Sequence, residues 1–276
     1  MRYRDFLRRE LDGIVPNEIV LPSGFHLVGY VALLHLDFNT MKYVSVIGEK
    51  TLEFDPRIQS VAVRTGPTAG ATRLPSYELV AGNSNTITTH VERGIKFRLD
   101  PLRLTFSGGN RRERIRLSDL VNDGEKVVDM FSCVGQFALH IAKAAEVEVT
   151  AIEINQDAYQ FLLENITLNG FTQSVKAILG DCREVHPKKE ANRVVMGYLH
   201  DTIEYLPFAL DTLVEEGGVI HMHMNAPETR LATIITEIKS TSKDRGYESA
   251  IDVRLVKNYS PGMGHYVFDI IVTSES

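Results

Sequence analysis

The chain has 276 residues, of which 43% are hydrophobic and 24% charged, and its net charge is −6 at pH 7. These values are typical of folded globular proteins, and they exclude a disordered chain and a protein that binds nucleic acid through bulk positive charge. The two cysteines are too few for a disulfide framework or a thiolate metal site. No apolar run approaches the ~20 residues that cross a bilayer, and the N-terminus lacks the apolar core of a secretory signal. We therefore expect a cytoplasmic protein of roughly two domains with no membrane partner.

Residues 1–108 alternate short apolar runs with turn-forming residues, which predicts an N-terminal α+β domain with a mostly antiparallel sheet. Strand-like runs cover residues 28–34 and 60–63, and residues 86–97 predict two strands that turn near Gly94. Turn signals rich in Gly, Pro, Ser and Asn fall at residues 21–24, 64–70, 74–78 and 81–85.

Residues 109–276 alternate strands and helices, which predicts an α/β domain built on a doubly wound parallel sheet. Strands are expected at residues 126–131, 147–154, 175–179, 193–199 and 217–224. Helices are expected at residues 136–145, 156–170 and 229–240, and a late pair of strands at 249–259 and 265–273. The late pair is expected to finish the sheet in antiparallel orientation.

Ligands of such sheets bind beyond the carboxyl ends of the strands, and three consecutive strand ends carry suitable residues. The first is followed by a turn with Gly135, which allows backbone N–H groups to approach a ligand but lacks the glycine pattern of a dinucleotide site. The second ends in Glu153, placed to accept ribose hydroxyls, although an ordinary exposed carboxylate explains it equally well. The third is followed by Asp181 and Cys182, which suit adenine, with a helix N-cap as the alternative for Asp181. Together they favour an adenosine cofactor without pyrophosphate, such as S-adenosylmethionine.

Residues 129–137 (DMFSCVGQF), 151–155 (AIEIN) and 180–183 (GDCR) resemble the motifs of class I methyltransferases. Residues 65–100 and 105–117 resemble, more specifically, the archaeal and eukaryotic group of enzymes that modify a tRNA guanosine beside the anticodon. That group contains guanine-N1 methyltransferases and wybutosine-pathway aminocarboxypropyltransferases. The resemblance runs from about Val28 to the C-terminus. It implies a Rossmann-like catalytic domain that binds S-adenosylmethionine over residues 109–276, and an N-terminal domain over residues 1–108 that binds and positions the tRNA.

The fourth predicted strand distinguishes the two branches. The methyltransferases carry an Asn-Leu-Pro or Asn-Pro-Pro motif there, whereas this chain has Met196-Gly197-Tyr198. That form resembles the archaeal aminocarboxypropyltransferases, and so does the F-S-x-x-N-x-x-E-R pattern of residues 106–114. The resemblance implies transfer of the 3-amino-3-carboxypropyl group of S-adenosylmethionine to C7 of 4-demethylwyosine in tRNA(Phe), with release of methylthioadenosine. A guanine-N1 methyltransferase and an inactive tRNA-binding relative remain alternatives, since Ser132-Cys133 and Gln136 depart from the usual Ala-Gly and Pro or His.

The resemblance also implies a set of cofactor contacts. They are Ser107, Arg114, Phe131, Gly135, Glu153, Asp181 and Cys182. A guanidinium at Arg114 suits a carboxylate held by two hydrogen bonds, and the alternative is a helix-surface ion pair with Glu113 or Asp119.

Other polar residues give weaker signals. No general base is evident, because a structural or stacking role explains His200 and Tyr198 equally well. The pair His221 and His223 has no third ligand nearby, so we expect no metal. The expected partner is tRNA(Phe) carrying a wyosine precursor, and no obligatory protein partner is evident. Its phosphates are expected to contact the N-terminal arginines and Arg111, Arg112 and Arg116.

Overall fold

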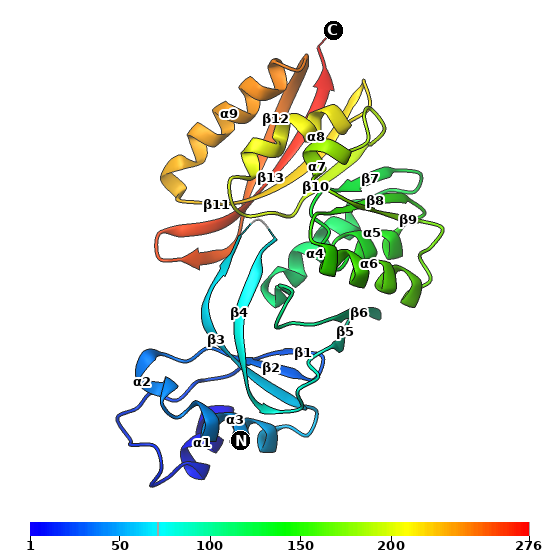
Figure 1. Ribbon diagram of the computed structural model, residues 1–276. Helices are drawn as coiled ribbons and strands as arrows, with labels where there is room; N and C mark the ends of the chain where they lie inside the picture. Colours follow the sequence, from blue (N-terminus) through cyan, green and yellow to red (C-terminus); the bar gives the residue numbers. More distant parts are fainter. Residues whose placement is uncertain (71, 276) are drawn as a thin grey trace. The chain divides into compact units, whose positions relative to one another are not determined.

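The computed structural model describes residues 1–70 and 72–275 and divides into two compact units, Met1–Gly108 and Gly109–Ser276 (Figure 1). Each unit has its own packed interior. In the described part of the chain, no helix is both long and apolar enough to cross a membrane.

The first unit contains a four-stranded sheet with the order β1-β2-β3-β4. Its strands are β1 (His26–Val28), β2 (Val31–Leu34), β3 (Ser60–Ala69) and β4 (Leu74–Gly82), and only the β2–β3 pair is parallel. Its helices are α1 (Tyr3–Glu10), α2 (Phe38–Met41) and α3 (Val44–Phe54), and a separate hairpin pairs β5 (Thr88–Glu92) with β6 (Ile95–Leu99). The mostly antiparallel sheet and the turn at Gly94 agree with the sequence.

Two expectations for this unit are wrong. Residues 28–34 form two strands rather than one, because the chain turns at Gly29, where φ is +56° and a Cβ atom would lie 2.0 Å from the Thr88 hydroxyl oxygen. The turn signals at residues 64–70 and 74–78 fall inside the long β3–β4 hairpin. Irregular pairing around Gly66 explains this, since proline and glycine are tolerated in strands where the ladder is interrupted.

The second unit is a seven-stranded sheet with the order β12-β13-β11-β10-β7-β8-β9. Its strands are β7 (Lys126–Asp129), β8 (Glu148–Glu153), β9 (Val175–Leu179), β10 (Arg193–Met196), β11 (Gly217–Ala226), β12 (Tyr247–Ser260) and β13 (Met263–Ser274). All neighbours from β11 to β9 are parallel, and β13 is antiparallel to both β11 and β12. The prediction of a doubly wound α/β sheet with an antiparallel final pair is confirmed.

Helices cover both faces of this sheet (Figure 1). They are α4 (Arg111–Asp119), α5 (Ala138–Ala144), α6 (Gln156–Leu168), α7 (Cys182–Val185), α8 (Leu206–Thr212) and α9 (Leu231–Lys243). Side chains alternate along the strands, so Met222 and Phe268 pack into the apolar core with α8 and α9, whereas His221 and Asp269 lie on the opposite face. The order of the parallel strands reverses beside β7, which places the expected ligand site at the carboxyl ends of β7, β8 and β10.

Candidate active site

The loop after β7 makes a tight turn that requires Gly135. Its φ is +92°, and a Cβ atom there would lie 2.9 Å from Leu139 and 3.0 Å from Leu162. The Gly135 N–H donates to the Ser132 carbonyl at 2.7 Å, and Cys133 also has a positive φ of +49°. Any larger residue at position 135 therefore strains the backbone and crowds the Leu139 and Leu162 side chains.

The carboxylate of Glu153 joins this loop to the end of β8. Its Oε2 accepts from the Cys133 N–H at 2.6 Å, and its Oε1 accepts from the Asn155 N–H at 2.7 Å. Only 9% of the residue is exposed, so the interpretation of Glu153 as an ordinary surface carboxylate is wrong. Burial raises its pKa, and the backbone N–H groups oppose that rise. Because a carboxylate has about four acceptor positions, Glu153 retains capacity for two hydroxyl groups.

After β9, Asp181 is the N-cap residue of α7, as one of the two interpretations of this residue predicts. Its Oδ1 accepts from the Arg183 N–H at 2.9 Å, which caps α7, and its Oδ2 accepts from the Arg183 guanidinium at 2.5 Å. These hydrogen bonds from Arg183 lower the pKa of Asp181. Cys182 is buried in the apolar core, and burial raises the pKa of its thiol to about 12. An adenine contact at Asp181 stays a prediction, and it requires Arg183 to share the carboxylate.

Arg114 is a residue of α4, the first helix of the second unit. The residue is fully buried, so a helix-surface ion pair with Glu113 or Asp119 is wrong as its explanation. Its guanidinium donates to the Gln136 Oε1 at 3.3 Å. Gln136 thus connects α4 to the loop after β7, which gives the unusual residue at this position a structural role. Ser107 belongs to the first unit, and its cofactor contact stays a prediction.

Aromatic rings surround the carboxyl ends of β7 and β10. Phe131 stacks on Tyr198 with ring centroids 5.2 Å apart and planes 19° apart, and it meets Tyr205 edge-on at 5.0 Å. Gly197 allows the Phe137 ring to pack close to the end of β10, since a Cβ atom at position 197 would lie 3.0 Å from that ring. The Met196-Gly197-Tyr198 motif therefore brings an aromatic ring to the strand end where the methyltransferase branch has Asn and Pro.

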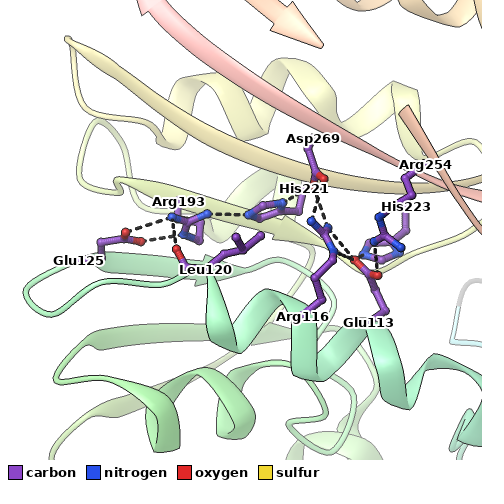
Figure 2. Close-up of polar contacts among 9 residues, drawn as sticks. All are labelled: Glu113, Arg116, Leu120, Glu125, Arg193, His221, His223, Arg254 and Asp269. Carbon is purple, nitrogen blue, oxygen red and sulfur yellow. Dashed lines mark hydrogen bonds and ion pairs between the residues drawn. The ribbon is translucent and has the colours of Figure 1, made fainter. Parts of the chain in front are cut away.

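A buried polar network lies between α4 and the sheet, and sequence reasoning missed it (Figure 2). The Arg193 guanidinium donates from Nε to Glu125 Oε2 at 2.7 Å and from Nη1 to His221 Nε2, also at 2.7 Å. Because arginine only donates, His221 Nε2 must accept, and its Nδ1–H then donates to Asp269 Oδ1 at 2.5 Å. His221 is therefore neutral, which agrees with the lowering of its pKa by burial.

The network continues from Asp269 to α4 (Figure 2). The guanidinium of Arg116 donates to Asp269 at 2.8 Å and to Glu113 at 2.7 Å, and Arg254 from β12 also pairs with Glu113. All three guanidinium nitrogens of Arg116 donate to these two carboxylates. The network therefore gives Arg116 a role inside the protein, and its contact with phosphate stays a prediction.

Asp129, at the end of β7, gives this site a pH dependence. It is fully buried, its Oδ2 accepts no hydrogen bond from the residues that the structure describes, and desolvation raises its pKa from 3.8 to about 7. The folded state thus holds a proton that the unfolded state loses, so this group contributes less stability as pH rises from about 4 to 7. Asp129→Asn removes this titratable group. The free energy of unfolding of the variant minus that of the wild type is therefore expected to increase as pH rises from about 4 to 7. Urea unfolding at pH 4.5, 6 and 7.5 measures the difference, and a constant or falling difference would contradict the expectation.

In the residues that the structure describes, no group of three or more His, Cys, Asp or Glu side chains is arranged to hold a metal ion.

The remaining evidence comes from similarity to known proteins. Residues 88–250 match the model of the TRM5/TYW2 methyltransferase domain, and residues 7–86 match that of the TYW2 N-terminal domain. The chain belongs to the TRM5/TYW2 family.

Individual relatives of this TRM5/TYW2 protein cover almost its whole length. The tRNA(Phe) (4-demethylwyosine(37)-C(7)) aminocarboxypropyltransferase of Pyrococcus horikoshii is 36% identical over 98% of this chain and 96% of the relative. A crystal structure of P. horikoshii TYW2 in complex with MeSAdo superposes with a TM-score of 0.86 at 32% identity, covering 99% of this chain and all of the other. The tRNA (guanine(37)-N(1))-methyltransferase Trm5b of Pyrococcus abyssi is 32% identical, over 94% of this chain and 78% of the relative.

Proposed function

We propose that this TRM5/TYW2 protein transfers the 3-amino-3-carboxypropyl group of S-adenosylmethionine to C7 of 4-demethylwyosine at position 37 of tRNA(Phe). The observation that carries the proposal is the similarity to the P. horikoshii aminocarboxypropyltransferase, which spans nearly the full length of both chains. The site supports it, because an aromatic ring replaces the Asn-Pro motif of the methyltransferase branch at the end of β10. We expect the protein to act in the cytoplasm.

The residues at the strand ends fit S-adenosylmethionine. Glu153 has acceptor positions left for the two ribose hydroxyls, and its hydrogen bond with the Cys133 N–H holds the loop that contains Gly135 beside the end of β8. Phe131 offers a ring face to adenine or to the thioether, and Arg114 offers a fixed positive charge for the methionyl carboxylate. Cys182 and Asp181 complete the adenine end.

The bound sulfonium supplies three electrophilic carbons, so geometry must select one of them. Transfer forms a bond from C7 to the methionyl γ-carbon, breaks the γ-carbon–sulfur bond, leaves the electron pair on a neutral thioether, and releases the C7 proton. We propose that the residues around Phe131 and Tyr198 contribute mainly by orienting the two reactants, since near-attack positioning alone accounts for large accelerations.

The first unit and the start of α4 are proposed to bind the tRNA backbone. Arg111 and Arg112 are exposed in the first turn of α4, whereas Arg116 is held by the buried network. Replacing both exposed arginines with alanine is expected to weaken tRNA binding and to reduce the slope of log K against log salt by roughly 1.5–2. Filter binding between 50 and 300 mM KCl measures the slope. An unchanged slope would exclude this surface from phosphate binding.

The transferred group decides the proposed function. We expect that S-adenosylmethionine labelled at the carboxyl carbon transfers its label to tRNA(Phe) carrying 4-demethylwyosine, with release of methylthioadenosine. Cofactor labelled at the methyl group is expected to leave the tRNA unlabelled. Entry of the methyl label would instead identify a methyltransferase, and entry of neither label, despite cofactor binding, would contradict catalysis on this substrate.

A further inference from the structure

The side chain of Lys257, in β12, reaches the start of α4, although the residues that meet there are 147 positions apart in the chain. Its Nζ atom donates to the Asn110 Oδ1 atom at 2.9 Å, and Asn110 is the N-cap residue of α4. A Cβ atom on Gly109 would lie 2.5 Å from the same Nζ atom, so a side chain at position 109 would displace the ammonium group. All three residues belong to the second unit.

An irregularity in β12 turns Lys257 toward α4. Arg254 lies opposite Val267 of β13. Lys257, three residues later, lies opposite His265, which is only two residues from Val267, so β12 contains one extra residue between the two pairs. Because directly opposed residues share a face of the sheet, Arg254 and Lys257 lie on the same face. Arg254 pairs with Glu113 of α4, so this is the face that α4 covers. Bulges of this kind re-aim side chains and are frequent beside active sites.

The positive charge of Lys257 lacks a counter-charge in the part of the chain that the structure describes. Arg254 is paired with a buried carboxylate, whereas Lys257 forms no ion pair there and donates to the neutral amide of Asn110. Burial lowers the pKa of the opposed His265 to about 4, and the charge of Lys257 adds to that effect, so this ring is neutral near pH 7. A half-buried cation without a counter-charge costs stability, and its position therefore favours a bound anion.

A second cation, Arg114, lies on the same side of α4. It follows Asn110 by four residues, which places both side chains on one face of the helix, and both are buried. Burial lowers the pKa of Lys257, and the nearby charge of Arg114 lowers it further. Arg114 also donates to Gln136 in the loop after β7, at 3.3 Å. Two like charges held near a helix N-terminus suit a carboxylate that accepts hydrogen bonds from both.

We propose that Lys257 and Arg114 together bind the methionyl carboxylate of S-adenosylmethionine, with Lys257 as the second cation of the site. Lys257 then holds the 3-amino-3-carboxypropyl group by its far end and takes no part in making or breaking bonds. The choice of this carboxylate as the anion rests on the proposed function, which places the methionyl part of S-adenosylmethionine beside Arg114.

Decarboxylated S-adenosylmethionine tests the proposal, because it keeps the sulfonium and the amine but lacks the carboxylate. In titration calorimetry with the full chain, Lys257→Met is expected to reduce the preference for S-adenosylmethionine over the decarboxylated form by about 10- to 100-fold. The affinity for methylthioadenosine, which lacks the whole transferred group, is expected to stay unchanged. Lys257→Arg keeps the charge and should retain most of the preference. Lys239→Met, on the exposed side of α9, is the control and should match the wild type.

The three ligands distinguish carboxylate binding from other roles of Lys257. An unchanged preference in Lys257→Met would overturn the proposal, and so would an equal loss of affinity for all three ligands, which would show a structural role. Weaker tRNA binding with the preference retained would assign Lys257 to a tRNA phosphate and would also overturn it. If the methyl label enters the tRNA but the preference depends on Lys257, the proposed function fails and the carboxylate site stands.

Discussion

Glu153→Ala is expected to weaken the binding of S-adenosylmethionine by at least about 100-fold, because the proposed ribose contacts are hydrogen bonds to a charged acceptor worth about 1.5–3 kcal/mol each. The change also removes the acceptor of the Cys133 N–H, which at 2.6 Å holds the loop after β7 against the end of β8. Affinity falls from both effects, since the loop must then be ordered by the ligand itself. Isothermal titration calorimetry with S-adenosylmethionine and with methylthioadenosine measures the loss.

Two further variants isolate the ribose contact. Glu153→Gln keeps the shape and one acceptor, so we expect an intermediate loss of about 10-fold. Glu148→Ala changes an exposed carboxylate at the other end of β8, and its affinity should match the wild type. Equal affinity in the wild type and in Glu153→Ala would remove Glu153 from the cofactor site and undermine the assignment of all three strand ends.

Glu113→Ala is expected to lower the free energy of unfolding by about 3–5 kcal/mol, the usual cost of removing one partner from a buried ionic cluster. The Glu113 side chain is 1% exposed and pairs with both Arg116 and Arg254. Without it, the two guanidinium groups lose a buried counter-charge, and α4 loses one of its connections to β12. Urea unfolding followed by circular dichroism measures the change.

The control for this variant is an ion pair of the same type on the surface. Glu215 pairs with Lys189 at 2.7 Å, and both side chains are mostly exposed, so Glu215→Ala should leave the unfolding midpoint unchanged. Glu113→Gln, which keeps hydrogen-bond acceptance but not the charge, should fall between the two. A change in Glu113→Ala no larger than in Glu215→Ala would show that the network is solvated and adds little to stability.

The failed predictions have a common physical origin. Residues 64–70 and 74–78 contain Gly, Pro and Ser, and they predict turns when only neighbours in sequence are considered. Residues 64–69 and 74–78 nevertheless lie in β3 and β4, because each strand supplies the hydrogen bonds of the other. Residues 28–34 predict one strand because their apolar pattern is continuous. The turn at Gly29 depends on contact with Thr88, which is distant in sequence.

The sequence by itself determined the α/β architecture of residues 109–276 and the placement of Gly135, Glu153 and Asp181 at strand ends. Strand and helix periodicity is local, and the carboxyl ends of parallel strands necessarily meet at one edge of the sheet. Those features needed no knowledge of which distant side chains touch.

Only the tertiary structure decided how the charged residues are used. Arg116 and Asp269 are 153 positions apart in the chain, and Glu113 and Arg254 are 141 apart, so no spacing rule relates them. Folding removed these groups from water, and a buried charge or amide must then find a partner in the protein or in a ligand. Arg116 found its partners inside the protein, in two carboxylates that folding brings to it from α4 and from β13.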